Sequence, residues 1–296
     1  MADNELRDAL VQLCDSELIF RRGTAPEASY TFKHALVQDA AYQSLLKSRR
    51  QTYHARIAML LEERFSDTVE NEPEILAHHF SEAGESEQAT DYWLRAGRRA
   101  AARVAYWEAA AHLRRGLDLV GDAWRHDDAW RRKALALQVA LGPALIATEG
   151  YLATETERCY VQARALCESL DDPAELFPVL YGLWVIHFIR AELDETRRIA
   201  EDFLQRAELG NNRTALLSAH RTLGSSLLGL GDFTAARQHL DRTIALYDAE
   251  RDRHLARTYS LDPNVTAKAY LCWTLWSLGY PDRARAAARE ARAFAE

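Results

Sequence analysis

The sequence predicts an all-α solenoid of antiparallel helix pairs, preceded by a small N-terminal unit with one β-hairpin. Three observations predict it. Apolar residues recur at helical spacing along almost the whole chain. A pattern of small residues around a turn returns several times, and only one stretch is typical of strands. The chain has 296 residues, of which 48% are hydrophobic and 27% charged, so it can bury the core that such an array needs.

The hairpin comes first and the helices follow. Residues 18–22 and 29–32 are rich in strand-forming side chains and flank a turn with Gly23 and Pro26. Pro73 and Pro281 stand where a first helical residue would lie, and Gly142-Pro143 predicts a bend or a break in a helix over 127–147. We expect helices near 34–47, 49–65, 73–82, 86–102, 105–120, 127–147, 154–170, 174–190, 193–208, 212–229, 233–247, 263–278 and 281–295.

The repeat is the most specific feature of the sequence. It places a small residue, a glycine, an alanine, an apolar residue and a second small residue at fixed intervals. Three copies are Ala77, Gly84, Ala89, Trp93, Ala96; Gly224, Gly231, Ala236, Leu240, Thr243; and Cys272, Gly279, Ala284, Ala288, Ala291. Two weaker copies are Gly97, Val104, Ala109, Leu113, Gly116 and Trp184, Ala191, Thr196, Ala200, Phe203. The glycine would end the first helix in a left-handed cap, and the small residues would let two helices approach closely.

This pattern resembles the tetratricopeptide (TPR) repeat, which implies a right-handed TPR-like α-solenoid. The array would occupy residues 49–296, after an N-terminal unit at 1–48. Gly231 and Gly279 lie 48 residues apart, so the polar segment 248–262 is expected to loop out. Such solenoids bind partners on a concave face. We therefore expect a protein or peptide partner, contacted by Trp184, His187, Trp273 and Trp276 on the first helices of their pairs; core packing between repeats is the open alternative for each.

The segment YTFKHALVQDAAY at 30–42 carries a second resemblance. A helix, a β-wing and F-x-H-x-L-V resemble the end of the winged-helix domain in STAND-type signalling ATPases. There, a histidine at this point contacts the β-phosphate of ADP, and His34 is the matching residue. Ala35 replaces the aspartate that follows the histidine in that family. Packing of His34 on the wing, at the start of a helix, is the alternative interpretation.

Further segments resemble a narrower group, the bacterial proteins that join a class III adenylate/guanylate cyclase domain, a STAND/AAA-type ATPase and a TPR-like tail. They are SLLKSRR at 44–50, AHHF at 77–80, YWLRAG at 92–97, HLRRGL at 112–117, LGPAL at 141–145 and LGYPD at 278–282. The resemblance implies a winged-helix remnant at 1–48 and the first part of that tail. ATP or ADP would be a ligand only if an ATPase core lies upstream.

The chain carries no recognisable catalytic motif. It has no G-x-x-x-x-G-K-[ST] loop to hold phosphates, and almost no strands on which paired cyclase aspartates could lie. We expect a non-enzymatic regulatory, sensor or scaffold module without a cofactor. One alternative is a fragment of a cyclase or ATPase whose catalytic domains lie upstream. Another is a winged-helix transcriptional regulator, although the expected recognition helix near 3–15 is acidic, which is unfavourable for phosphate contacts.

Charge and composition exclude several partners. The formal net charge of −7 disfavours nucleic acid and anionic membranes. The acidic N-terminus lacks a signal peptide, and the four cysteines form no C-x-x-C pair, which together indicate a cytoplasmic protein with free thiols. His78 and His79 with Glu82 lack metal-ligand spacing, so no metal site is expected. Arginine clusters near 49–56, 95–103 and 131–133 are interpreted as solvated helix faces because acidic residues stand nearby.

Overall fold

The computed structural model describes residues 3–24, 28–170, 173–258 and 262–295. Contacts divide the chain into two compact units, Met1–Ala89 and Thr90–Glu296. This division falls within helix α6 and differs from the expected boundary after residue 48, which stays a prediction.

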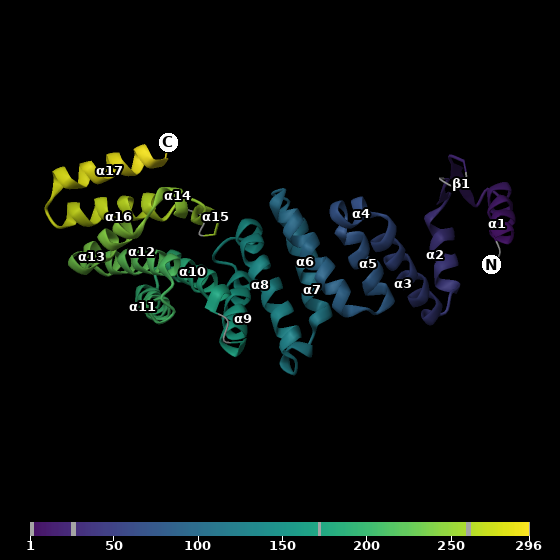
Figure 1. Cartoon of the computed structure of the whole chain (residues 1–296), viewed down its shortest axis with the longest axis horizontal. Coiled ribbons are helices and arrows are strands. Elements are labelled where there is room, and N and C mark those ends of the chain that lie inside the picture. Colours follow the sequence, from purple (N-terminus) through teal and green to yellow (C-terminus); the bar gives the residue numbers. More distant parts are fainter. Residues whose placement is uncertain (1–2, 25–27, 171–172, 259–261, 296) are drawn as a thin grey trace. The chain divides into compact units, whose positions relative to one another are not determined.

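The first unit holds the hairpin and the helices that follow it (Figure 1). Strands β1 and β2 pair antiparallel, with Ile19 opposite Phe32, and Ile19 is buried. Helix α3 packs on α5, and the short α4 contacts both. The elements are α1 (Asp3–Asp15), β1 (Ile19–Arg22), β2 (Ser29–Phe32), α2 (Ala35–Ser44), α3 (Lys47–Arg64), α4 (Ser66–Asn71) and α5 (Pro73–Ala83).

The second unit is an array of antiparallel helix pairs. Its elements are α6 (Ser86–Ala102), α7 (Tyr106–Val120), the 3-10 turn η1 (Ala123–Arg125), α8 (Asp128–Glu149), α9 (Thr154–Leu170), α10 (Pro173–Ile189), α11 (Leu193–Leu209), α12 (Arg213–Leu230), α13 (Phe233–Leu246), α14 (Ala249–Asp252), α15 (Leu255–Thr258), α16 (Pro263–Ser277) and α17 (Pro281–Ala295). Helices α10, α12 and α16 each pack on the helix that closes their own pair, and α12 contacts both α10 and α16. The predicted all-α, TPR-like solenoid is confirmed.

The turns of the five repeat copies share one geometry. The residue at the glycine position has a positive φ in every copy: Gly84 85°, Val104 65°, Ala191 57°, Gly231 83° and Gly279 83°. The next amide then donates to the carbonyl five residues earlier, as from Asp232 to Leu227 at 3.0 Å and from Ala105 to Ala100 at 2.9 Å. The alignment therefore located these turns even in the two copies that lack the glycine.

Small residues at the helix contacts allow the close approach that the repeat predicts. A Cβ on Gly224 would lie 2.8 Å from Leu240, and one on Gly97 would lie 2.4 Å from Leu113. The expectation differs in the last copy, where Ala288 is exposed and its neighbour Ala287 is buried instead. Helix α17 therefore turns a neighbouring residue toward α16 at that level.

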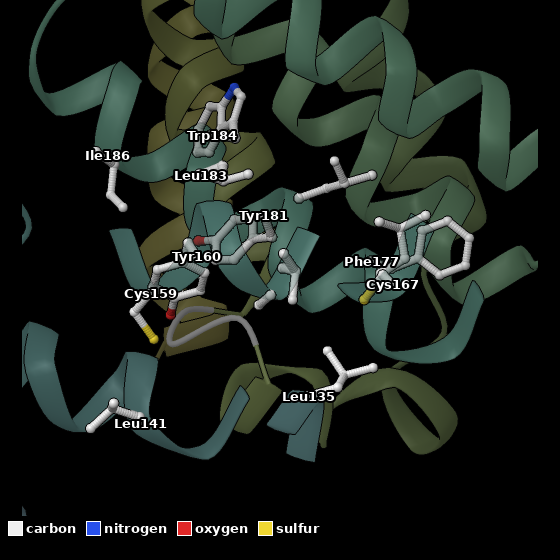
Figure 2. Packing of buried hydrophobic residues seen from close by; sticks show 14 of the residues in the cluster. Leu135, Leu141, Cys159, Tyr160, Cys167, Phe177, Tyr181, Leu183, Trp184 and Ile186 are labelled. Carbon is white, nitrogen blue, oxygen red and sulfur yellow. The ribbon is translucent and has the colours of Figure 1, made fainter. Parts of the chain in front are cut away.

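Helix α8 runs without a break through Gly142-Pro143, so the predicted alternative of a split is wrong, whereas the alternative of a bend stays a prediction. A proline removes one backbone hydrogen-bond donor from the helix. Packing of α8 against α9 stabilises the helical conformation despite this loss. The Tyr160 ring fills the space beside Gly142 and Gly182, where a Cβ would lie 2.7 Å and 2.1 Å from that ring. Figure 2 shows Tyr160 among the buried side chains of this region, next to Cys159.

The segment 248–262, expected to loop out of the array, contains α14 and α15. It is anchored through Asp252, whose buried carboxylate pairs with Arg213 at 3.2 Å and with Arg251 at 3.1 Å. These ion pairs lower the pKa of Asp252 against the opposing effect of burial. Residues 259–261 of the segment lie outside the described part of the chain.

Within the described residues, no helix is both long and apolar enough to cross a membrane.

Candidate functional site

Five aromatic side chains form a continuous row across the second unit. We call Tyr181, Trp184, Phe188, Tyr270 and Trp273 the aromatic row. The first three lie on α10 and the last two on α16. The helical spacing of three or four residues places neighbours on one face, so each ring meets the next.

The row begins in the core and ends at the surface. On α10 the rings stack, with centroids 5.8 Å apart from Tyr181 to Trp184 and 4.8 Å apart from Trp184 to Phe188. The crossing to α16 is edge-on, with Phe188 6.2 Å from Tyr270 and Tyr270 5.5 Å from Trp273. Trp184 is only 3% exposed, whereas Trp273 is 62% exposed. Stacked and edge-on pairs at these distances add to the stability that burial provides.

Arg221, on α12, lies behind the row. Its guanidinium carbon is 4.9 Å from the Tyr181 ring centroid and 5.3 Å from that of Trp184, so two aromatic faces stabilise the cation. The residue is 2% exposed, and its Nη2 has no hydrogen-bond partner among the described residues. No carboxylate in the described part of the chain pairs with it. This uncompensated charge lowers the pKa of Tyr270, although burial raises that pKa more.

The tryptophans predicted as binding residues occupy two different environments. Trp184 packs in the core and donates its indole N–H to Ser226 at 2.9 Å, so core packing describes it (Figure 2). Trp273 and Trp276 are each 62% exposed and lie one turn apart on α16. Two exposed indoles one turn apart present an apolar surface patch, and large exposed apolar patches commonly mark interaction sites.

His187 lies in the last turn of α10, three residues after Trp184. Its Nδ1 pairs with Glu192, and its backbone carbonyl accepts from the Glu192 amide at 3.0 Å. These contacts close the turn in which Ala191 takes the left-handed conformation. The structure therefore places Trp273 and Trp276 one turn apart on α16, whereas the His187 side chain pairs with Glu192 at the end of α10.

The N-terminal candidates belong to the first unit. His34 is exposed at the N-cap position of α2, where its side chain caps no amide. His79 bonds to His54, a residue that the sequence did not single out. No group of three or more possible metal ligands lies close together within the described residues.

Sequence reasoning missed Tyr181, Phe188, Arg221 and Tyr270. Their contacts join helices that lie far apart in the chain, and no local pattern reveals such a pairing. Arg221 had one usable signal: it lies four residues from Leu217 and from Ser225, on the apolar and small-residue face of α12. A lone arginine on a buried helix face calls for a specific partner.

The fold and this face define a helical-repeat protein of the TPR-like class. No protein-family model matches the sequence. An uncharacterised protein of Rhizobium meliloti (strain 1021) is 26% identical over 294 residues. The match covers 98% of this chain but 28% of that protein, so the chain spans little more than a quarter of its relative's length.

Solved structures share the fold at low sequence identity. The apo form of RapI matches with a TM-score of 0.56 at 10% identity, over 87% of this chain and 76% of that chain. A Rap protein complexed with competence and sporulation factor matches with a TM-score of 0.51 at 11% identity, over 87% and 68%. A STAND protein with a tetratricopeptide repeat sensor from Pyrococcus horikoshii has a TM-score of 0.49 at 12% identity, over 98% and 47%. The first two similarities show a shared fold, and the TPR-like repeats of a putative kinesin light chain from Podosopora anserina match with a TM-score of 0.51 at 15% identity, over 68% of this chain and 92% of that chain, which shows the TPR-like fold.

Proposed function

We propose that the chain is a non-catalytic module that binds a protein or peptide on the face of α10, α12 and α16. The observation that carries this proposal is the aromatic row, which leads from the buried Arg221 to the exposed Trp273. Tryptophan is enriched among the residues that dominate binding energies. A Rap protein of the same fold was solved with competence and sporulation factor bound, which agrees with this use of the fold.

The geometry favours a partner with a large apolar side chain next to an acidic group. Trp273 and Trp276 offer apolar area at the surface, and Trp273 rests on Tyr270, which restricts its rotamers. The unpaired charge of Arg221 makes the potential behind the row positive, which favours an acidic neighbour in the ligand.

A peptide library displayed on phage and selected on the whole chain tests this proposal. We expect selected peptides to combine an aromatic or aliphatic anchor with Asp or Glu. Trp273→Ala and Trp276→Ala should each weaken their binding by about tenfold or more. The control is Trp107→Ala on α7, which removes an indole that is 69% exposed elsewhere in the same unit. Equal affinities for all three variants would refute the proposed face.

The wider context rests on the sequence resemblance. We place the chain, as a proposal, in a longer signalling protein with a STAND-type ATPase and a cyclase domain upstream. Exposed apolar side chains in the first unit support it: Phe20, Leu36, Leu46, Met59 and Phe65 are each more than half exposed, as expected of a surface that another domain covers. His34 would then face bound ADP.

The size of the native product tests this context. An immunoblot of source-cell lysate, with mass spectrometry of the band, should show a product well above 33.6 kDa. In that longer protein, His34→Ala should speed the release of ADP. A product of 33.6 kDa that starts at Met1 would instead indicate a free-standing adaptor. The transcriptional-regulator alternative predicts salt-dependent DNA binding in a gel shift, which the acidic α1 disfavours.

A further inference from the structure

A cavity of about 750 Å³ lies within the first unit, between β2, α2, α3 and α5. Cavities of this size hold small molecules in other proteins. Its apolar wall consists of Phe32, Leu45, Tyr53 and Ile57. Helix α2 buries none of its own residues, so the space beneath it is open.

A chain of hydrogen bonds crosses the polar side of the cavity. His79 Nδ1 lies 2.8 Å from His54 Nδ1, and His54 Nε2 lies 3.0 Å from the Tyr42 hydroxyl. That hydroxyl donates to Glu82 Oε2 at 3.2 Å. These hydrogen bonds thus connect residues from three helices, α2, α3 and α5.

The Glu82 carboxylate determines which group donates and which accepts in each of these hydrogen bonds. A carboxylate only accepts hydrogen bonds, so the Tyr42 hydroxyl donates its single proton to Glu82. Tyr42 must then accept from His54 Nε2–H, which leaves a lone pair on His54 Nδ1 to accept from His79 Nδ1–H. This direction requires a neutral His54, and donation from His79 Nδ1–H is compatible with either charge state of His79. Burial favours the neutral form of both imidazoles, because it lowers the pKa of His54 and lowers that of His79 to about 4.

These hydrogen bonds leave unused acceptor atoms on residues that line the cavity. Neutral His79 donates through Nδ1–H and therefore has an acceptor lone pair at Nε2. Glu82 accepts from Tyr42 through Oε2, so its second carboxylate oxygen can accept another hydrogen bond. The Asp39 carboxylate also lines the cavity. The structure gives none of these three acceptors a hydrogen-bond donor from the described residues.

Arg50 is the one permanently cationic side chain among the described residues that line the cavity, and His78 lines it too. The Arg50 guanidinium lies 5.0 Å from the Tyr42 ring centroid and donates through one nitrogen to Gln43 at 3.3 Å. The carboxylates of Asp39 and Glu82 outnumber this one permanent cation. The free aromatic face of Tyr53 can stabilise a further cation.

We infer that this cavity binds a small organic cation, with a protonated amine at His79, Glu82 and Asp39 and an apolar body against Tyr53 and Ile57. An ammonium group has three donors, which match the three open acceptors. An anion would be attracted by one arginine, Arg50, and repelled by two carboxylates. The site belongs to the first unit and the face proposed for peptide binding to the second, and neither inference depends on the other.

Titration of the whole chain with 2-phenylethylammonium tests the inference. The histidine ring ¹⁵N signals report binding directly, because His54 and His79 line the cavity and their nitrogens take part in its hydrogen bonds. We expect saturable shifts of these signals at millimolar ligand, weaker shifts with 2-phenylethanol and none with 3-phenylpropionate. Equal response to the neutral alcohol, binding of the carboxylate, or no saturation with the amine would overturn the inference.

Two variants locate the site. Glu82→Gln and Asp39→Asn each remove one charge with little change in shape, and each should weaken amine binding by about two- to fivefold, as expected for a partly exposed ionic contact. Glu85→Gln is the control, because Glu85 is exposed on the same unit but does not line the cavity. Asp39 is exposed, so Asp39→Asn should fold normally even if Glu82→Gln does not. Unchanged affinity in Asp39→Asn, or equal weakening in the control, would contradict the proposed site.

Discussion

Val104 holds a strained backbone conformation at the end of α6, and glycine at this position should be more stable than alanine. Its φ is 65°, in the left-handed region that β-branched residues avoid. The turn keeps this conformation because the Ala105 amide donates to the Ala100 carbonyl at 2.9 Å and the Val104 amide donates to Ala101 at 2.9 Å. Two hydrogen bonds thus offset the unfavourable dihedral angle.

The magnitude follows from comparing glycine with alanine at this position. The left-handed conformation costs an L-residue about 1–2 kcal/mol. Glycine avoids that cost but loses about 0.5–1 kcal/mol more conformational freedom on folding. Val104→Gly should therefore be more stable than Val104→Ala by about 0.5–1 kcal/mol. Both variants lose the same contacts of a side chain that is 69% exposed, so burial cancels in the difference.

Gly231 provides the reverse experiment. Its φ is 83°, and a Cβ at this position would have nothing within 4 Å. Gly231→Ala therefore tests the dihedral cost alone, and it should destabilise the protein by about 0.5–1 kcal/mol. An ordinary helix interior gives the opposite order, with alanine about 1 kcal/mol better than glycine.

Urea unfolding followed by circular dichroism at 222 nm measures these differences. Repeat arrays can unfold in several steps, so midpoints of the same transition are compared, together with hydrogen exchange of the amides around the turn. The reasoning fails if alanine at position 104 is more stable than glycine, or if Gly231→Ala leaves the midpoint unchanged.

Three further perturbations test the packing and charge of the second unit. Gly182→Ala places a Cβ 2.1 Å from the Tyr160 ring and should lower the free energy of unfolding by about 1–3 kcal/mol, measured by urea unfolding; a neutral result would contradict the close packing. Phe203→Ala empties a fully buried site and should cost about 3–5 kcal/mol in the same assay, whereas a cost under 1 kcal/mol would show that the site collapses. Burial lowers the pKa of His220, which bonds to His239 at 3.0 Å, from 6.5 to about 4. The unfolded state then binds the proton first, so stability is complete above pH 6.5 and falls between pH 6.5 and pH 4; a midpoint that does not change over this window would refute this.

The fold was largely predictable because its signals are local. Helix periodicity, the prolines at 73 and 281 and the repeat each depend on residues within a few turns of one another. The left-handed position at Val104 could be located without a glycine, because the spacing to Ala109 and Leu113 fixed the register. The break that was one alternative at Gly142-Pro143 is absent for the opposite reason: packing on α9, a tertiary effect, overrides a local helix-breaking signal.

The candidate sites were predictable only in part. Trp273 and Trp276 were found as large apolar residues on the first helix of a pair, and both are exposed. Trp184 has the same sequence signal but is buried against Ser226, because α12 covers it. Exposure depends on what packs over a helix, and helical periodicity alone does not reveal this.

The sequence by itself determined the helix pairs, their turns and the absence of the P-loop that an ATPase core would need. These properties follow from backbone conformations and from hydrogen bonds that span about five residues. Only the tertiary structure decided which side chains meet: Phe188 with Tyr270, Arg221 with Tyr181, and His54 with His79. Each of these contacts joins two helices, and the close packing of small residues between helices sets where the helices cross.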